Sequence, residues 1–274
     1  MMKKYLSGGL FYLLKLLIAV VIICPVLYAI SASFMTNSAL ASWPPNLIPP
    51  KVVFTNYQMA LRSVPLFKFL INSLIVCAIV ITAQVITASC TAYAFSFFEF
   101  KGRNILFMVV LATMMIPQDA TIIANFLTIS QLKLTDTYVA LVLPYLTGAM
   151  GIFLMRQFYL TVPKELKEAA TIDGCGDLRF LLNILMPISI PSIASLCIYV
   201  FIQTYNQFLW PLLVTNTMDK RTVQVGMQML HNSEAAEYGI VLAGAVMVLI
   251  PSIVVFIIGQ KYLIKGMTAG AVKG

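Results

Sequence analysis

The feature that most constrains this chain is a series of long apolar stretches, each about as long as a membrane is thick. Five of them hold about twenty or more residues with few charges, and a sixth is interrupted only by Pro144 and glycines. At about 1.5 Å per residue, a helix of roughly twenty residues crosses the hydrocarbon of a bilayer. We therefore predict an all-α polytopic membrane protein with six transmembrane helices, over residues 10–34, 71–97, 104–124, 137–158, 187–210 and 239–263.

Composition excludes a water-soluble fold. Hydrophobic residues make up 60% of the chain and charged residues only 10%, whereas a globular surface needs about a quarter of its residues charged. The net charge of +8 is better explained by the cytoplasmic flanks of membrane spans than by a nucleic-acid groove. We expect the lipid bilayer, and no nucleic acid, as a partner.

Basic residues fall unequally on the two sides of the membrane. Of the 18 lysines and arginines, twelve lie on the side of the termini and six on the other. The positive-inside rule places the richer side in the cytoplasm, and six spans likewise return both termini to one side. The first apolar run continues to Phe34, longer than a signal-peptide core, which predicts an uncleaved span. The six external basic residues are Lys51, Arg62, Lys68, Lys133, Lys220 and Arg221.

The chain is predicted to be one transmembrane domain over 1–274, with external loops at 35–70 and 211–238 and a cytoplasmic loop at 159–186. The second external loop, at about 28 residues, is too long for a simple turn. It is either a contact with something outside the membrane or a solvated excursion.

The cytoplasmic loop 159–186 is predicted to contain two short helices. Pro163 suits the first turn of the earlier helix, and Gly174 suits the position after its end, where a positive φ is needed. Leu166, Ala169 and Ala170 fall on one face of that helix, and small side chains there permit close approach of a partner. Asp177 is predicted to cap the second helix.

Catalytic motifs are absent from the sequence. The one histidine, His231, lies in a polar loop, where a solvated role is the alternative to a base or a metal ligand. No HExxH, CxxC, GxSxG or GxxxxGK[ST] pattern occurs, so neither a metal site nor a nucleotide-binding site of its own is supported. We expect no enzyme activity, and any ATP must be hydrolysed by another chain.

Polar side chains expected at membrane depth lie in the second, third and fifth predicted spans and are few, and of these only Asp119 is charged at neutral pH. A secondary transporter usually buries several ionisable groups and repeats them in two halves, neither of which is found here. The polar cluster in the fifth span either lines a water-filled path or joins helices, and Asp119 is expected near the outer mouth rather than in a proton relay. The candidate path residues are Gln118, Asp119, Gln203, Tyr205, Asn206 and Gln207.

The cytoplasmic loop carries a spaced motif: Glu168-Ala169-Ala170, then Asp173-Gly174, Phe180, Ile184, Pro187 and Pro191. It resembles the EAA loop of permease subunits in binding-protein-dependent ABC importers, of the carbohydrate-uptake branch, and the similarity extends over essentially the whole chain. Supporting segments are Asn56-Tyr57, Asn72-Ser73-Leu74, Arg156-Gln157-Phe158, 206–211 and the tail Gly270–Gly274.

The resemblance implies a type I permease fold in the inner membrane of a bacterial or archaeal cell. It implies that the EAA loop is a coupling helix on an ATP-binding subunit, where Glu168 pairs with a basic side chain, rather than being a solvated charge. It further implies a dimer of ATPase subunits that use ATP and Mg, a paralogous second permease, an extracellular solute-binding protein at loop 211–238, and a tail near the ATPase. The coupling residues it implies are Glu165, Glu168, Ala169, Ala170, Asp173 and Gly174.

Three positions depart from the family pattern: Cys175 and Met186, which conserve volume, and Tyr205, which stands where tryptophan is common. The departure at Tyr205 leaves the substrate more open. A sugar or related polar solute is expected, and glycerol-3-phosphate or its diesters are the alternative, since residues 206–211 also resemble glycerol-3-phosphate permeases. A self-contained secondary transporter or channel, and then a membrane enzyme, are more remote alternatives.

Overall fold

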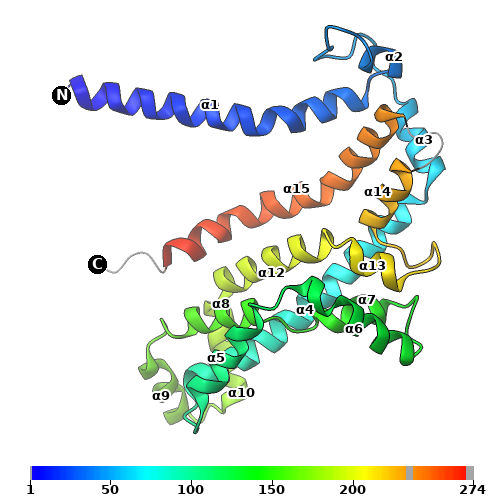
Figure 1. Cartoon of the computed structure of the whole chain (residues 1–274). Coiled ribbons are helices and arrows are strands. Elements are labelled where there is room, and N and C mark those ends of the chain that lie inside the picture. Colours follow the sequence, from blue (N-terminus) through cyan, green and yellow to red (C-terminus); the bar gives the residue numbers. More distant parts are fainter. Residues whose placement is uncertain (1, 233–236, 270–274) are drawn as a thin grey trace. The chain divides into compact units, whose positions relative to one another are not determined.

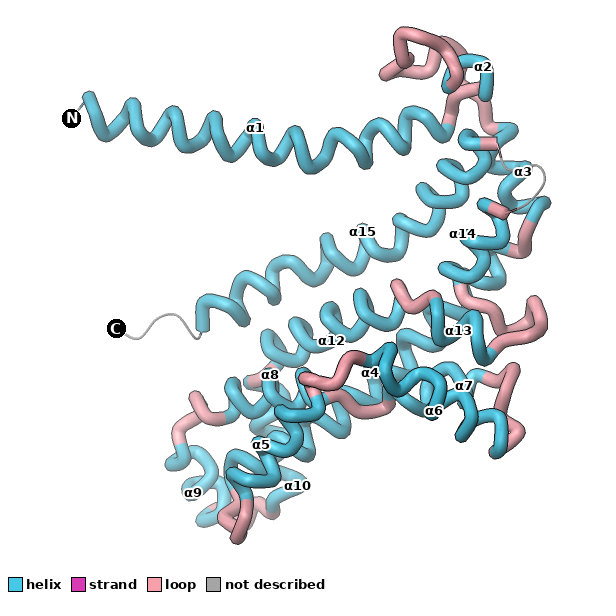
Figure 2. Tube along the Cα trace, viewed as in Figure 1, coloured by secondary structure: helices cyan, strands magenta, loops and turns pink. Residues whose placement is uncertain are grey.

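The computed structural model shown in Figure 1 describes residues 2–232 and 237–269, with side chains described for 11–232 and 237–262. Every regular element in these ranges is a helix (Figure 2). The chain divides into two compact units, one formed by Met1–Phe67 with Gly226–Ile250 and the other by Lys68–Val225 with Pro251–Gly274. The expected all-α architecture is therefore confirmed.

In the first unit, a side chain from a short helix is hydrogen-bonded to the end of a long helix. The long helix is α1 (Met2–Ser33), followed by α2 (Asn37–Leu40) and α3 (Thr55–Ser63). The Asn56 side chain donates to the carbonyl oxygens of Ser33 and Met35, both at 2.8 Å, and so satisfies acceptors left open where a helix ends. At Gly239, in α15 (Tyr238–Ala269), an added Cβ would lie 2.6 Å from the Asn56 amide nitrogen, so glycine permits the close packing.

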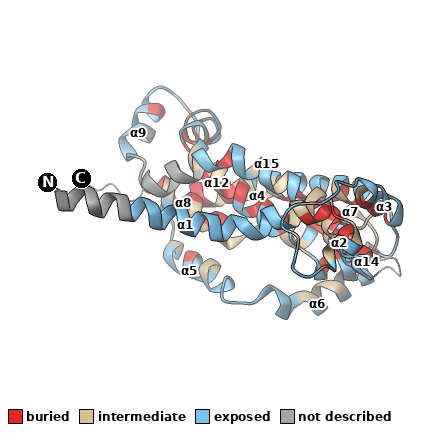
Figure 3. Cartoon of the chain, turned by 90° about the horizontal axis from the view of Figure 1, so that it is seen from above, coloured by how far each residue is buried: buried red, intermediate tan, exposed pale blue. Residues whose placement is uncertain are grey.

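The second unit holds the main core. Many of its buried residues lie on α4 (Leu66–Phe97), α8 (Ala149–Tyr159) and α12 (Ile190–Tyr205), coloured red in Figure 3. Tyr159, Phe180 and Leu196 are among the largest fully buried side chains. By contrast, none of the apolar window in α1 is buried, as expected for a helix whose surroundings are lipid chains.

Three expected spans are bent rather than continuous. The span predicted over 104–124 consists of α5 (Arg103–Thr113) and α6 (Gln118–Gln131), bent by 91° at Pro117. Proline has no N–H and its ring clashes with the preceding turn, so Pro117 instead precedes the first turn of α6. In the fifth span the bend is 80°, at Ser189, the third residue of the predicted range 187–210, so this span begins where its two prolines predicted. A single continuous helix was the wrong expectation for the third span.

The predicted span 137–158 also breaks, near the expected Pro144 and glycines. It consists of α7 (Tyr138–Val142), a 3-10 turn (Leu143–Tyr145) and α8, with a bend of 48°. In the part of the chain that the structure describes, three continuous helices are long and apolar enough to cross a membrane, and counting each bent pair as one span gives six. The remaining helices are α9 (Lys164–Ile172), α10 (Asp177–Phe180), the π-helical turn Leu181–Leu185, α11 (Met186–Ile188), α13 (Leu209–Val214) and α14 (Val223–His231).

Candidate functional site

The loop 159–186 folds into the two predicted helices, joined by a tight turn. Gly174 has the expected positive φ, +75°. Its N–H bonds to the carbonyl of Thr171 at 3.0 Å, and the N–H of Cys175 bonds to the carbonyl of Ala170 at 2.8 Å. This pair of bonds is a Schellman motif, which satisfies the last carbonyls of α9 and fixes where the chain leaves it.

Helix α9 presents most of its predicted coupling residues to the outside. Glu165, in its first turn, is exposed, as are Glu168, Ala169 and Asp173, the C-cap residue that follows the helix. Ala170 is buried against the core of the second unit. The expectation that Ala169 and Ala170 share one partner-facing side is therefore wrong, because Ala170 anchors the helix from behind.

An exposed apolar residue on α9 was missed from the sequence. Ile172 is 87% exposed, and Leu166, six residues earlier, is 38% exposed. A residue spacing of three places Leu166, Ala169 and Ile172 along one side of the helix. Apolar side chains left exposed outside the bilayer indicate a protein contact. The residue spacing predicts this apolar side, whereas the small residues of the motif point to Ala170.

Asp177 does not cap the second helix, contrary to expectation. Gly176 precedes α10 without a side-chain bond, and the Asp177 carboxylate instead accepts from the Tyr93 hydroxyl at 2.7 Å and from the Lys167 ammonium at 2.5 Å. Desolvation lowers the pKa of Lys167, but the bonds to Asp177 and Tyr93 outweigh it and raise that pKa above its usual value. The pair joins α9 to α10 and to the end of α4.

A polar cavity of about 320 Å³ lies in the second unit. Three of the predicted path residues, Gln118, Gln203 and Gln207, line it. Among the described residues around it, none carries a charge. The cavity is therefore a neutral surface of amides and hydroxyls. Its other polar lining residues are Gln84, Thr113, Thr121, Asn125, Tyr145, Thr147, Tyr199 and Thr204.

Residues at the breaks in the third and fourth spans line this cavity. Ile116 and Gln118 come from the break before α6, and Tyr145 and Gly148 come from the break before α8. The Gln84 side chain donates to the freed carbonyl of Tyr145 at 2.9 Å. Irregular backbone within a membrane protein is tolerated where it is bonded in this way or lines a cavity.

The other three predicted path residues do not line the cavity. Asp119 is exposed in the first turn of α6. Tyr205 is only 2% exposed and stacks on Phe201, with ring centroids 5.1 Å apart. Asn206 donates to the carbonyl of Ile202 at 2.9 Å and so closes the end of α12. The sequence showed that these residues were polar but not which way they pointed.

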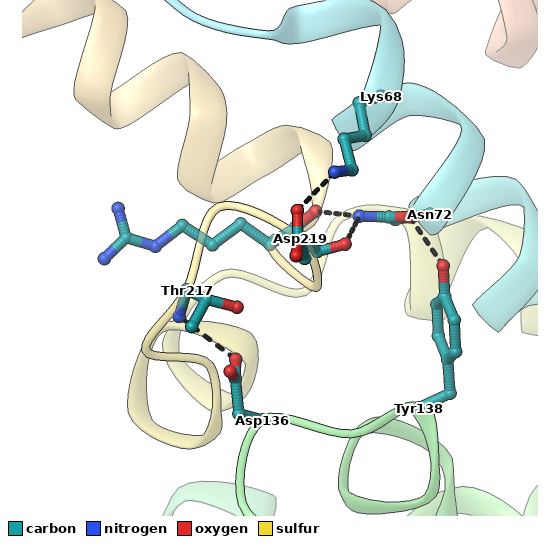
Figure 4. A network of polar contacts seen from close by, with 7 residues as sticks. Lys68, Asn72, Asp136, Tyr138, Thr217 and Asp219 are labelled. Atoms are coloured by element: carbon teal, nitrogen blue, oxygen red, sulfur yellow. Dashed lines mark hydrogen bonds and ion pairs between the residues drawn. The ribbon is translucent and has the colours of Figure 1, made fainter.

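The described part of the loop 211–238 is tied to neighbouring segments rather than free in solvent. Asn72 donates to the carbonyls of Asp219 and Arg221, both at 2.9 Å, and accepts from the Tyr138 hydroxyl at 2.7 Å (Figure 4). Asp136 accepts from the backbone N–H groups of residues 216 and 217, both at 3.1 Å. The tail Gly270–Gly274, which carried part of the resemblance, lies outside the described residues.

Apolar spans around a neutral polar cavity, together with an exposed helix on a separate polar loop, define a membrane transport subunit. Residues 48–268 match the family described as "Binding-protein-dependent transport system inner membrane component". The chain belongs to this family and is a permease subunit of an ABC importer, which works with ATPase and solute-binding partners. Membership in this family favours an importer subunit over a self-contained secondary transporter and over a membrane enzyme.

Relatives cover nearly the whole chain. It is 34% identical over 279 residues to the arabinooligosaccharides transport system permease protein AraQ of Halalkalibacterium halodurans, with all of both chains covered. It is 33% identical to the sn-glycerol-3-phosphate transport system permease protein UgpE of Brucella melitensis, with 97% of both covered. A chain of a bacterial ABC transporter involved in alginate import shares the fold, with a TM-score of 0.83, 23% identity, and 95% of this chain and 98% of that chain covered.

Proposed function

We propose that this chain forms half of the pathway of a sugar importer in a bacterial or archaeal cell membrane. It pairs with a paralogous permease, and both of its termini lie in the cytoplasm. A dimer of ATPase subunits binds ATP and Mg at the inner face, while this chain binds neither. A solute-binding protein delivers the solute at the outer face. Family membership and the basic-residue asymmetry of the loops support this arrangement.

The observation that carries the proposal is the exposed helix α9. It offers the carboxylates of Glu165 and Glu168 beside apolar side chains that lack a cover within the described chain. In the proposed complex Glu168 pairs with a basic residue of the ATPase, Ala169 and Ile172 seat against it, and the Gly174 turn fixes the helix direction. Closing and opening of the ATPase dimer then bias the pathway between its two states.

The neutral cavity favours an uncharged solute. Amide and hydroxyl groups bond well to the hydroxyls of a sugar, whereas a phosphate is usually bound by arginine, lysine or a helix N-terminus. The N-terminus of α6 lies at the cavity through Gln118, but the carboxylate of Asp119 in the same turn offsets its positive end. Import of glycerol-3-phosphate stays a second candidate because relatives that are 33% identical carry that name.

Purification of a tagged copy from its own host in mild detergent, followed by mass spectrometry, tests the assembly. We expect a second permease and an ATPase with Walker motifs to be recovered together with the chain. Recovery of the chain alone, with solute uptake in vesicles that lack ATP, would contradict the proposal. Uptake of a labelled arabino-oligosaccharide, with glycerol-3-phosphate as competitor, then separates the two solute classes.

A further inference from the structure

We propose that Tyr93, Lys167 and Asp177 form a mechanical joint that carries movement of α9 into the membrane-spanning helix α4. The three residues are positioning residues, and the inference rests on the proposed function of α9 as the ATPase contact. The sequence motif of the loop does not include this set, because the three residues come from three separate helices.

The joint is built around one atom. Oδ1 of Asp177, the first residue of α10, accepts both the Tyr93 hydroxyl at 2.7 Å and the Lys167 ammonium at 2.5 Å. Tyr93 belongs to the last turns of α4 and Lys167 to the middle of α9. One carboxylate oxygen therefore connects the coupling helix, the helix after it and a membrane span.

The α4 side of the joint is firmly held. Tyr93 is only 4% exposed, and its ring packs on the rings of Phe97 and Phe180, with centroids 5.2 and 6.2 Å away. The Lys167 ammonium lies 5.0 Å from the centroid of the same Phe180 ring, a distance at which a cation is attracted to an aromatic face. A displacement of Lys167 thus acts on a packed cluster rather than on a loose surface side chain.

The other attachments of α9 give little control of how it lies against α4. Ala170 is buried but has only a methyl group, and the hydrogen-bonded turn at Gly174 fixes α9 relative to the segment that follows it, not relative to α4. Lys167 is the long side chain that sets how α9 lies against the end of α4. The same α4 carries Gln84, which holds the break beside the cavity, nine residues or about 13 Å from Tyr93.

The test is the number of solute molecules moved per ATP hydrolysed by the whole importer in proteoliposomes. We expect Asp177→Asn and Lys167→Gln to lower this ratio about fivefold, as the loss of one modest contact implies. The double variant Lys167→Asp with Asp177→Lys restores the pair with its charges exchanged, so the ratio should recover. Lys101→Gln, at an exposed lysine in the turn before α5 and outside the proposed ATPase contact, is the matched control and should leave the ratio unchanged.

Tyr93→Phe keeps the ring packing and removes only the hydroxyl, so it keeps the test decisive if the charged variants fail to assemble. We expect the ratio to fall in this variant too. An unchanged ratio in Tyr93→Phe and in Asp177→Asn, in complexes that retain their ATPase, would overturn the joint alone. A wild-type chain that recovers no ATPase would instead overturn the proposed function.

Discussion

Asn72, near the start of α4, donates its side-chain amide to the backbone carbonyl of Asp219, a residue 147 positions further along the chain. The same amide nitrogen reaches the carbonyl of Arg221, and the amide oxygen accepts from Tyr138 (Figure 4). Lys68, one helical turn before Asn72, pairs with the Asp219 carboxylate. A single buried side chain therefore fixes the backbone of the proposed binding-protein contact to the membrane spans.

Replacing Asn72 by alanine should loosen this segment. The Asn72 side chain is 3% exposed, and each of its hydrogen bonds to the partly buried carbonyls of Asp219 and Arg221 contributes about 1 kcal/mol. We expect a lower thermal midpoint of the purified chain in detergent. Tyr138→Phe removes only one of the bonds and should cost about 1 kcal/mol. Equal midpoints for Asn72→Ala and wild type would show that the segment is held elsewhere.

Acidification should release the same segment. The hydrogen bond from Lys68 lowers the pKa of Asp219. At Asp136, desolvation acts in the opposite direction, but hydrogen bonds from the backbone and side chain of Thr217 and from the N–H of Asn216 outweigh it and lower that pKa too. A lowered folded-state pKa means that the stabilisation is present above the ordinary value of about 4 and is lost as pH falls through the folded value. A nitroxide attached at Asn216→Cys, whose exposed side chain is not part of these contacts, should stay immobilised from pH 7 to about pH 4 and gain mobility below it.

The matched control for the pH experiment is Asp136→Asn, which cannot lose a carboxylate at that site. In this variant the nitroxide should be more mobile at pH 7 and respond less to acid. A label whose mobility rises well above pH 5 would contradict the role of the two carboxylates.

Two glycines in the turn after α9 offer a paired test of backbone strain. At both Gly174 and Gly176 an added Cβ meets nothing within 4 Å, but only Gly174 has a positive φ. Gly174→Ala should therefore destabilise the chain by about 1–2 kcal/mol through the backbone alone. Gly176→Ala, at φ −72°, should be neutral or stabilise by up to about 1 kcal/mol. Comparing the thermal midpoints of the two variants separates the effect of backbone conformation from the effect of adding a methyl group. Equal shifts in midpoint would contradict this explanation.

Hydrophobic length and charge predicted the number of spans and the helical content because both follow directly from the bilayer. They did not predict the bend at Pro117. A proline shows that a helix is interrupted, but whether the chain continues in the same direction depends on what neighbouring side chains do for the freed backbone groups. At the break before α8 that role belongs to Gln84, which acts on the carbonyl of Tyr145, a contact between helices.

At the candidate site too, a local backbone feature could be predicted from the sequence, whereas the packing of side chains could not. The turn at Gly174 could be predicted, since a positive φ is a local property with a glycine signature. The direction of a side chain around a helix could not, because it depends on packing. Tyr205 and Gln203 are two residues apart, yet one stacks inside the core and the other lines the cavity. Asp177 has the residue type of a helix cap and is used instead by distant partners.

A glutamine in the cavity provides a test of solute contact. We expect Gln203→Leu to lower kcat/KM for uptake about tenfold, because a lost hydrogen bond of about 1.5 kcal/mol corresponds to that factor. Gln260→Leu, on α15, where the side chain donates to the carbonyl of Ile257 in the same helix, is the matched control and should transport normally. Normal uptake by Gln203→Leu would show that this part of the cavity does not contact the transported solute.

Reversing the charge at Glu168 tests the ATPase contact directly. Glu168 is exposed on α9, so Glu168→Lys leaves the interior of the chain unchanged and should be expressed and inserted like wild type. Placed against a basic residue of the ATPase, the new lysine replaces an attraction by a repulsion between like charges. We expect uptake to be lost and less ATPase to co-purify.

The matched control is Glu99→Lys, which reverses an exposed charge on the same predicted cytoplasmic side of the membrane. This variant should retain both uptake and the co-purifying ATPase. Since the two variants change net charge equally, normal uptake by Glu168→Lys would remove Glu168 from the coupling contact.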